Sequence, residues 1–580
     1  MTRYLILFAF LNLGLFAQTN NTSAGCSPGL NYKIFDANNI HTKIYSSGDM
    51  HFDIFGTGNA LYEFPSGSGK TLCNASHIWI GGINSGGQLK LAGQTYRQSG
   101  LDFWPGPLSI IDGSIYANDC YKYDYVWKVN TSDIDNFIDN YNNGNVQNGS
   151  YTIPNDILSW PVKDTISPNF VTNAPFVDVN HNGKYDPKNE GDYPLIKGDQ
   201  TLFQIFNDNG NAHSSSGSSP MGLQFNQTVY GYNCENEIQL YPELLNTTFY
   251  HYKIYNRSQY DYHSSYIAFW VDGDIGTRTD DYVGSNPKKA YGFFYNGYNI
   301  DAVYGNQTPA LGVLLLKAPK AQSFDGVDND NDSIMDEPGE ELLTPRILYF
   351  NHSTFTNTVS PSMTDPTNGA QFYQYMSGYW RDGSPYTCGG QAYGGSNPIH
   401  SVFTGSNSAT NDCSASWTEK TSGNPVGNRC LLVCTGPIYI AAYDSLELEY
   451  AMVSSVDSTI TNSSFASTLK LQKDVDKVRN FYYSNNKSDC FLEVGIKQLN
   501  IENEISVFPN PVESYINIKS DLSNHSKATI SITDVLGREL FRNDTNYLSQ
   551  SIDITFLTKG IYLITINVDE HLFVRKIIKN

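Results

Sequence analysis

The sequence is short of positive charge and lacks the motifs of several common enzyme classes. Among its 580 residues, 37 are Lys or Arg and 58 are Asp or Glu, which gives a formal net charge of −21. Nucleic-acid binding depends on Lys and Arg side chains that neutralise phosphates, so this balance argues against a nucleic-acid partner. The motifs HExxH and GxSxG do not occur, and no CxxC pairs stand at zinc spacing. An enzyme is therefore not excluded, but no catalytic motif supports one.

Long hydrophobic runs are also scarce. The clearest is Tyr4–Phe16, which follows Arg3 and precedes a polar stretch that begins at Gln18. This layout predicts a signal peptide over residues 1–17. The run is shorter than the roughly 20 apolar residues that a spanning helix needs, so no transmembrane segment is expected in the mature chain. Cys26 follows Ala-Gly, as at the end of a lipobox, but it lies too far beyond the apolar run for lipidation to be favoured.

Nine cysteines are present, and an exported chain can form disulfides. An odd number leaves at least one free thiol or an intermolecular bond, and the pairing cannot be deduced. Cys430 and Cys434 lie in an apolar run that predicts a strand. Residues four apart on a strand are about 13 Å apart, whereas a disulfide needs Cα atoms within about 7 Å. These two cysteines are therefore not expected to pair with each other.

The composition favours a β-rich fold with many turns, since the chain holds 41 Tyr, 30 Phe and 48 Gly. We predict a mainly β protein: tandem β-sandwich-like domains with long loops, one late helix and a small C-terminal Ig-like β-sandwich. Residues 18–200 would form an N-terminal β-rich domain and residues 201–495 a second sandwich. A helix is expected near residues 464–482, with Phe465, Leu469, Val475, Val478 and Phe481 on one face.

An acidic loop at residues 178–190 has the spacing of a calcium loop. Side-chain oxygens recur at alternate positions, and Gly183 permits the sharp turn that such a loop needs. Counted from Asp178 as position 1, position 12 of the loop is Asn189, where an EF-hand has Glu. Glu190 comes one residue late, so an EF-hand is not expected. The predicted ligands are Asp178, Asn180, Asn182, Lys184 through its carbonyl, and Asp186.

Two further acidic segments are candidates for calcium. The segment at 328–336 resembles the Asp-rich loops of thrombospondin type 3 repeats, and closely spaced aspartates repel one another without a cation. The third cluster contains Asp272 and Asp274, with Asp280 and Asp281 close by in the sequence. Asp and Asn also favour turns without any metal. In the segment at 328–336 the predicted ligands are Asp328, Asp330, Asp332, Ile334 through its carbonyl, and Asp336. Calcium is therefore the predicted cofactor, in a structural role.

Clustered aromatic residues leave a second alternative open. One group contains Tyr121, Tyr123, Tyr125 and Trp127, placed at alternate positions of a predicted strand, and another spans residues 373–380. Packing in the core is the favoured interpretation. Rings that remained exposed could instead stack on sugars.

The C-terminal stretch from Ile505 to Asn580 is a series of short apolar–polar alternations, which predicts a small β module. It contains the phrases Val507-Phe508-Pro509-Asn510-Pro511, Gly537-Arg538, Gly560-Ile561-Tyr562-Leu563-Ile564 and Val574-Arg575-Lys576-Ile577-Ile578-Lys579. Through these phrases it resembles the type A C-terminal sorting domain of Bacteroidetes, the export signal of the type IX secretion system. The resemblance implies translocation across the outer membrane by that machinery, followed by release or attachment to lipopolysaccharide.

The main region, roughly residues 50–485, resembles a family of large secreted Bacteroidetes proteins without an assigned activity. Among the phrases that carry this resemblance are Ile78-Trp79-Ile80-Gly81-Gly82 and Tyr379-Trp380-Arg381-Asp382-Gly383. We expect a secreted or cell-surface protein. Its predicted function is adhesion or contact with extracellular glycan or matrix, without catalysis and with loops stiffened by calcium. The alternative is a secreted hydrolase of polysaccharide or protein.

Overall fold

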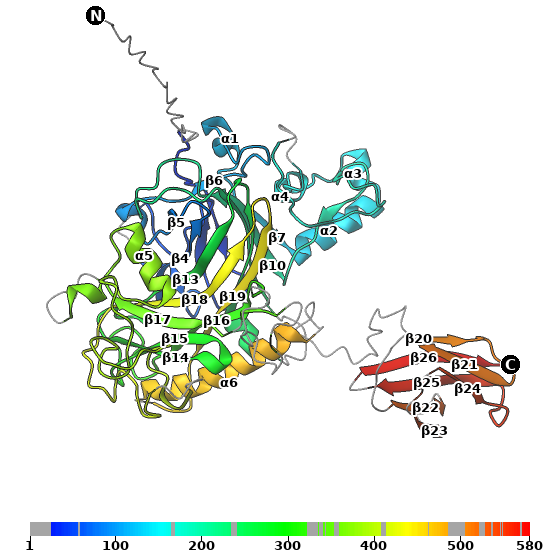
Figure 1. Cartoon of the computed structure of the whole chain (residues 1–580). Coiled ribbons are helices and arrows are strands. Elements are labelled where there is room, and N and C mark those ends of the chain that lie inside the picture. Colours follow the sequence, from blue (N-terminus) through cyan, green and yellow to red (C-terminus); the bar gives the residue numbers. More distant parts are fainter. Residues whose placement is uncertain are drawn as a thin grey trace, which may run out of the picture. The chain divides into compact units, whose positions relative to one another are not determined.

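The computed structural model divides the chain into two compact units, Met1–Cys490 and Phe491–Asn580. Each unit is described by itself, and Figure 1 gives the element labels. The structure describes residues 25–55, 59–163, 169–233, 241–321, 335, 340–342, 344–352, 359–407, 413–461, 463–484, 505–520, 528–534, 538–545, 547, 549–568 and 571–580.

The large unit is built on two antiparallel sheets. The larger one has nine strands, of which β7 pairs with β10 beside the main path. In spatial order its strands are β14 (Asp281–Asn286), β15 (Tyr291–Asn296), β16 (Ala310–Lys317), β19 (Ser445–Ser455), β12 (Thr247–Asn256), β11 (Leu223–Gly231), β10 (Gln200–Asn207) and β6 (Trp104–Pro105), with β7 at Trp127–Asn130.

The second sheet has six strands, and β5 pairs with β4 beside the main path. Its order is β17 (Arg346–Asn351), β18 (Arg429–Ile440), β13 (Tyr262–Gly273), β4 (Thr71–Asn84) and β3 (Tyr62–Glu63), with β5 at Leu89–Ala92. Two small ribbons complete the unit: β1 (Tyr32–Phe35) with β2 (Thr42–Tyr45), and β8 (Phe176–Val177) with β9 (Tyr193–Pro194).

The two sheets pack face to face through aromatic side chains. Phe269 on β13 stacks on Tyr450 of β19 with ring centroids 4.9 Å apart. The same ring lies 5.2 Å from that of Tyr250 on β12. These residues are fully buried in one continuous core that draws on both sheets. Alternation along the strands explains this packing, because every second side chain points to the same face.

The predicted division at residues 200 and 201 is wrong. Strand β4, from the first predicted domain, pairs with β13 from the second. In the other sheet, β7 pairs with β10, so residues on both sides of the boundary share hydrogen-bonded ladders. Residues 18–200 and 201–495 therefore do not form tandem sandwiches. Pairing between strands far apart in the sequence left no local signal that could have revealed this.

The helices are more numerous than the single late helix that was predicted. The late helix itself is confirmed, since α6 spans Ser464–Tyr483 and packs on β16 and β19. Its buried face differs from the prediction, because Phe465 and Leu469 are 57% and 50% exposed. Leu471 is buried instead, against Gly312 of β16. The other helices are α1 (Ala117–Lys122), α2 (Thr131–Asn142), α3 (Asn145–Asn148), α4 (Asn155–Leu158) and α5 (Gly369–Ser377).

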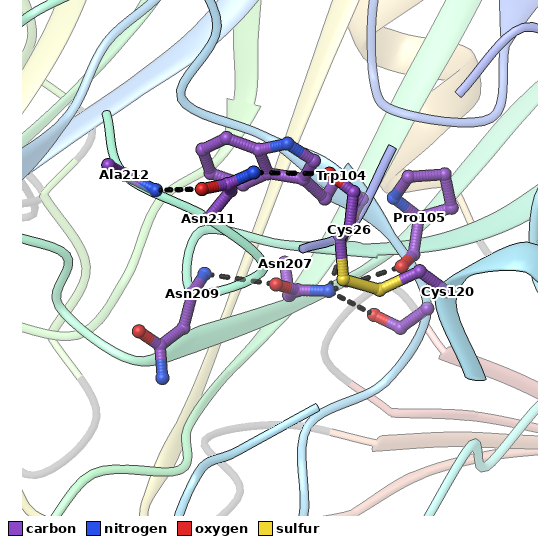
Figure 2. The surroundings of a disulfide bond; sticks show 9 residues. Cys26, Trp104, Pro105, Cys120, Asn207, Asn209, Asn211 and Ala212 are labelled. Carbon is purple, nitrogen blue, oxygen red and sulfur yellow. Dashed lines mark hydrogen bonds between the residues drawn. A yellow bond between two sulfur atoms is a disulfide. The ribbon is translucent and has the colours of Figure 1, made fainter. Parts of the chain in front are cut away.

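Two disulfides lie in the described part of the large unit. Cys26 pairs with Cys120, and Cys388 pairs with Cys413, with Cα atoms 5.7 and 5.6 Å apart. Figure 2 shows the first bond beside Asn207, whose side-chain amide donates to the carbonyl oxygens of Trp104, Pro105 and Gly106. Cys430 and Cys434 are both free and buried on β18. They therefore do not pair with each other, as predicted.

The small unit consists of two sheets around an aliphatic core that includes Ile516, Ile530 and Ile564. One sheet has the order β20-β21-β24 and the other β23-β22-β25-β26. Its strands confirm the predicted β module: β20 (Ile505–Phe508), β21 (Tyr515–Ser520), β22 (Ala528–Asp534), β23 (Glu539–Thr545), β24 (Gln550–Asp553), β25 (Gly560–Val568) and β26 (His571–Lys579).

Candidate functional site

The acidic loop at residues 178–190 is closed by hydrogen bonds from its own backbone. Asp178 accepts from the backbone N–H groups of Asn182 and Gly183, at 3.1 and 2.6 Å. Burial by itself would raise the pKa of Asp178, but the hydrogen bonds from the backbone of Gly183 and Asn182 outweigh it and lower the pKa. The Asn182 amide donates to both oxygens of Glu190, at 2.9 and 2.8 Å. Glu190 therefore reaches the loop, one residue later than in an EF-hand.

The other predicted residues of this loop divide into two groups. The side-chain oxygen of Asn180 accepts from the backbone of Asn182 at 3.1 Å. Asp186, by contrast, accepts from the Asn189 backbone at 3.0 Å and caps the following turn. Lys184 is exposed. The second predicted loop, with Asp328, Asp330, Asp332, Ile334 and Asp336, lies outside the described residues.

Within the third cluster, Asp272 has hydrogen-bond partners of its own. The carboxylate of Asp272 accepts hydrogen bonds from the Tyr96 hydroxyl, the Asn74 amide and the Cys430 thiol. The distance between Asn74 Nδ2 and Asp272 Oδ2 is 3.0 Å. Burial raises the pKa of Asp272, although the hydrogen bond from Tyr96 opposes the rise. This carboxyl belongs to the buried end of β13, whereas Asp274 lies beyond the strand.

Asp274, Asp280 and Asp281 gather at the connection from β13 to β14, where the chain crosses from one sheet to the other. The Oδ1 atom of each is buried and accepts no hydrogen bond among the described residues. Burial and the charge of Asp272 raise the pKa of Asp274 to about 8. Burial and the charge of Asp301 raise that of Asp280 to about 6. The pKa of Asp281 rises too, from burial and the charge of Asp274.

We call Asp274, Asp280, Asp281 and Asp301 the acidic cluster. Asp301 is its anchored member, because it accepts from the backbone N–H groups of Val303 and Thr277 at 2.8 and 3.1 Å. Buried oxygens that accept no hydrogen bond are costly, and a cation would satisfy them. No group of three or more His, Cys, Asp or Glu side chains in the described part of the chain is arranged to hold a metal ion as it stands.

A pocket of about 500 Å³ opens on the outer face of the nine-stranded sheet. Strand pairing builds its floor in two rows of directly opposed residues. One row runs from Thr228 through His251 to Glu449. The other joins Lys253 on β12 to Glu447 on β19. Further lining residues come from stretches that precede β10 and from α6: Trp160, Pro175, Leu195 and Lys197, and Tyr482. We call this the lysine pocket.

Glu449 is the buried centre of the lysine pocket, with its side chain 1% exposed. Lys197 Nζ lies 3.1 Å and His251 Nδ1 3.2 Å from Glu449 Oε2. The hydroxyls of Tyr230 and Tyr482 donate to the same carboxylate. Burial by itself raises the pKa of Glu449, but the His251 bond and the Lys197 charge outweigh it and hold the pKa at about 2.

Glu447 lies at the open side of the lysine pocket and is shared by two lysines. Lys317 Nζ and Lys253 Nζ lie 2.7 and 3.1 Å from its oxygens. Partial burial raises the pKa of Glu447, yet the hydrogen bonds from Lys317 and Lys253 reverse the effect and lower it to about 2. Both carboxylates of the pocket are therefore ionised at neutral pH.

Sequence reasoning missed the lysine pocket. Its residues lie on the five strands β10, β11, β12, β16 and β19, on stretches that precede β10, and on α6, so no motif joins them. The available signal was local: His251, Lys253 and Tyr255 alternate along β12 with the core residues Tyr250, Tyr252 and Ile254. Such alternation identifies the outer face of a strand, but it does not tell which other strands lie beside it.

The aromatic groups mostly pack in the core. Tyr121 lies in helix α1 and is 83% exposed. The predicted strand over residues 121–127 is therefore wrong, and a strand, β7, begins only at Trp127. Trp127 is 6% exposed. In the second group, Tyr375 and Trp380 are fully buried. Neither group forms an exposed row of rings.

These features define a mainly β protein with a large sandwich unit and a separate small β unit. Residues 506–580 match the family model described as a secretion system C-terminal sorting domain. The chain is therefore a cargo of the type IX secretion system, delivered across the outer membrane to the cell surface or secreted, and its C-terminal domain interacts with that machinery. No helix among the described residues is long and apolar enough to cross a membrane.

The other comparisons add little. No curated protein matches the chain significantly. Among solved structures, a polysaccharide lyase aligns with 61% of this chain at 8% identity and a TM-score of 0.16. The alignment covers 34% of the lyase, so the chain spans about a third of that protein's length. A superposition of this quality carries no argument about fold or activity.

Proposed function

We propose that this exported chain is a non-enzymatic adhesion protein that contacts extracellular glycan or matrix and whose loops are stiffened by calcium. The observation that carries the proposal is the division of its buried acids. Asp274, Asp280 and Asp281 in the acidic cluster have raised pKa values, whereas Glu447 and Glu449 in the open pocket have lowered ones and are ionised. Glycoside hydrolysis needs a protonated and an ionised carboxyl on the two sides of one bond. Both carboxyls among the described lining residues of the lysine pocket are ionised, which favours contact over hydrolysis there.

Calcium suits the acidic cluster for electrostatic reasons. Asp274 follows β13 and Asp281 begins β14, so an ion held by both would join the two sheets at their crossover. Binding would require the carboxylates to rotate toward one ion. It would satisfy the Oδ1 atoms of Asp274, Asp280 and Asp281 and remove their mutual repulsion. The loop at 178–190 and the segment at 328–336 are additional candidate sites.

A thermal melt of the full chain in EDTA and in 5 mM calcium tests this proposal. With dissociation constants of about 10⁻⁴ to 10⁻³ M, binding to the folded state stabilises by about 1 to 2.3 kcal/mol. Asp281→Asn should remove the part of the shift that comes from the acidic cluster, and Asp178→Asn the part from the loop. The double change of Asp328 and Asp330 to Asn tests the second segment. Asp476→Asn, which removes a surface ion pair with Lys289, is the control and should leave the shift intact.

The absence of any calcium-dependent shift would refute the calcium part of the proposal. Release of sugars or peptides from extracellular polysaccharide or protein by the purified chain would refute the non-enzymatic part. That result would favour the alternative of a secreted hydrolase.

A further inference from the structure

The lysine pocket carries a surplus of positive charge on a strongly acidic chain. Three lysines line it, and Glu447 and Glu449 supply two negative charges, which leaves one positive charge before His251 is considered. The formal net charge of the whole chain is −21. A local reversal of sign in a concave site raises the local concentration of anions there.

The lysines of the open side have unused hydrogen-bonding capacity. An ammonium group carries three N–H donors. Lys253 and Lys317 each bind Glu447, and their side chains are 40% and 35% exposed. Further donors on both lysines are therefore available to a ligand that enters from solvent. An anionic ligand would also balance the pair of lysines that now share one carboxylate.

The rest of the pocket is suited to a ring with hydroxyl groups. Leu195, which is 54% exposed, and the accessible edges of the otherwise buried Trp160, Phe203 and Tyr255 give the pocket apolar surface, while Asn173 and Thr228 contribute polar groups. A volume of about 500 Å³ falls within the range of pockets that hold small ligands. Apolar surface with a few polar groups suits a sugar ring, which has both C–H and hydroxyl groups.

We propose that the lysine pocket binds a carboxylate-bearing saccharide. Lys253 and Lys317 hold the carboxylate, and the apolar walls contact the sugar ring. This inference deepens the glycan contact proposed above by naming the chemical class of the ligand, and it does not depend on calcium. Lys197, His251, Tyr230 and Tyr482 position the floor by fixing Glu449 and do not themselves need to touch the ligand.

Calorimetric titration of the full chain with tetragalacturonate tests the inference. The buffer contains EDTA, which prevents calcium from bridging the sugar to the protein. We expect saturable binding that weakens as the salt concentration rises, because the contact is ionic. A neutral galactose tetramer should not bind. Lys253→Gln removes a charge-assisted contact and should weaken the affinity about tenfold or more, while Lys317 keeps Glu447 paired.

Two further variants keep the test decisive. Lys317→Gln should weaken binding as Lys253→Gln does, so a folding defect in one variant does not end the test. Lys289→Gln removes a comparable ion pair, Lys289 with Asp476 at 2.7 Å, away from the pocket walls. Its affinity should equal that of the unchanged chain.

The inference is overturned if tetragalacturonate does not bind, if the neutral tetramer binds equally well, or if neither pocket variant changes the affinity. Tighter binding of tetraglutamate than of tetragalacturonate would also overturn it, since an acidic peptide would then be the better ligand. Contact with a neutral glycan or with matrix protein could still be measured after such a failure. The broader proposal and this inference are therefore tested separately.

Discussion

Tyr482 near the end of α6 donates a hydrogen bond to the buried carboxylate of Glu449, with 3.0 Å between Tyr482 Oη and Glu449 Oε2. This bond ties the late helix to β19, a central strand of the nine-stranded sheet. The helix thereby forms one wall of the lysine pocket. Packing of α6 and the shape of the pocket are consequently coupled through one carboxylate.

Replacing Glu449 with Gln should destabilise the chain at neutral pH by on the order of 2 to 3 kcal/mol. The pKa of Glu449 is about 2 when folded, against 4.5 for the ordinary group. A carboxyl with a lowered folded pKa contributes stability that is present above the unfolded pKa and is lost as the pH falls through the folded one. The difference in unfolding free energy between the two proteins should shrink from about pH 4.5 to about pH 2. Denaturant melts across this range measure it.

Glu447→Gln provides the control for that experiment. Glu447 also has a pKa of about 2, but its side chain is 33% exposed, so solvent screens its interactions. We expect a smaller loss than for Glu449→Gln. Equal losses, or a loss at Glu449 that does not change with pH, would contradict the assignment of Glu449 as the buried ionised centre.

Asp274→Asn should raise the melting temperature in EDTA at pH 8. The folded pKa of Asp274 is about 8, far above 3.8, because burial and neighbouring aspartates disfavour its charge. The folded chain holds this proton while the unfolded chain releases it, so stability falls as the pH rises from about 4 to 8. Asp274→Asn removes this loss of stability, so its free energy of unfolding at pH 8 should exceed that of the unchanged chain by about 1 kcal/mol or more. Melts recorded at steps of pH provide the measurement.

Calcium should flatten the same pH dependence in the unchanged chain, because a bound cation favours the ionised carboxyl. Asp476→Asn should behave like the unchanged chain throughout. A variant at Asp274 that melts lower than the unchanged chain at pH 8 in EDTA would show that the carboxyl is stabilising there, contrary to our expectation.

Removal of the Cys26–Cys120 disulfide by replacing both residues with Ser should cost about 2 to 4 kcal/mol of stability. The bond closes a loop with a sequence separation of 94, whereas Cys388–Cys413 spans 25. Loop-closure entropy therefore predicts that the first bond contributes about 1 kcal/mol more than the second. Melts of the two double variants compare them.

The same bond predicts that Cys26 carries no lipid, because its sulfur is already bonded to Cys120. Mass spectrometry of the non-reduced exported protein should find the Cys26–Cys120 cross-link. Incorporation of labelled palmitate at Cys26 would contradict this prediction.

Deletion of residues 505–580 should trap the remainder in the periplasm, since the sorting domain lies within them. Cell fractionation and protease treatment of whole cells measure the location. Deletion of residues 145–148, which form helix α3 and lie far from the sorting domain in sequence, is the matched control and should leave export unchanged. Display of the shortened chain on the cell surface would refute the role of the domain.

Individual strands were largely predictable. The sequence alternates over Phe249–Tyr255 and has short apolar runs at Tyr266–Val271 and Ala310–Leu316, which coincide with β12, β13 and β16. Both patterns are local signs of a strand, because they reflect burial on one face or on both. The face of α6 was only partly predictable. Val475, Val478 and Phe481 are buried as expected, but Leu471 replaced Leu469, since the space beside Gly312 decides which side chain enters.

The sequence by itself determined the export route, the mainly β class and the existence of the late helix, because each is encoded in contiguous residues. Only the tertiary structure decided that residues on both sides of position 200 share their sheets, that Asp272 is bonded by Asn74 from β4, and that Lys253 and Glu447 meet across two strands. The physical reason is the same in each case. Register between strands distant in the chain is set by burial of one shared core, and local sequence specifies which face a residue occupies but not its neighbour.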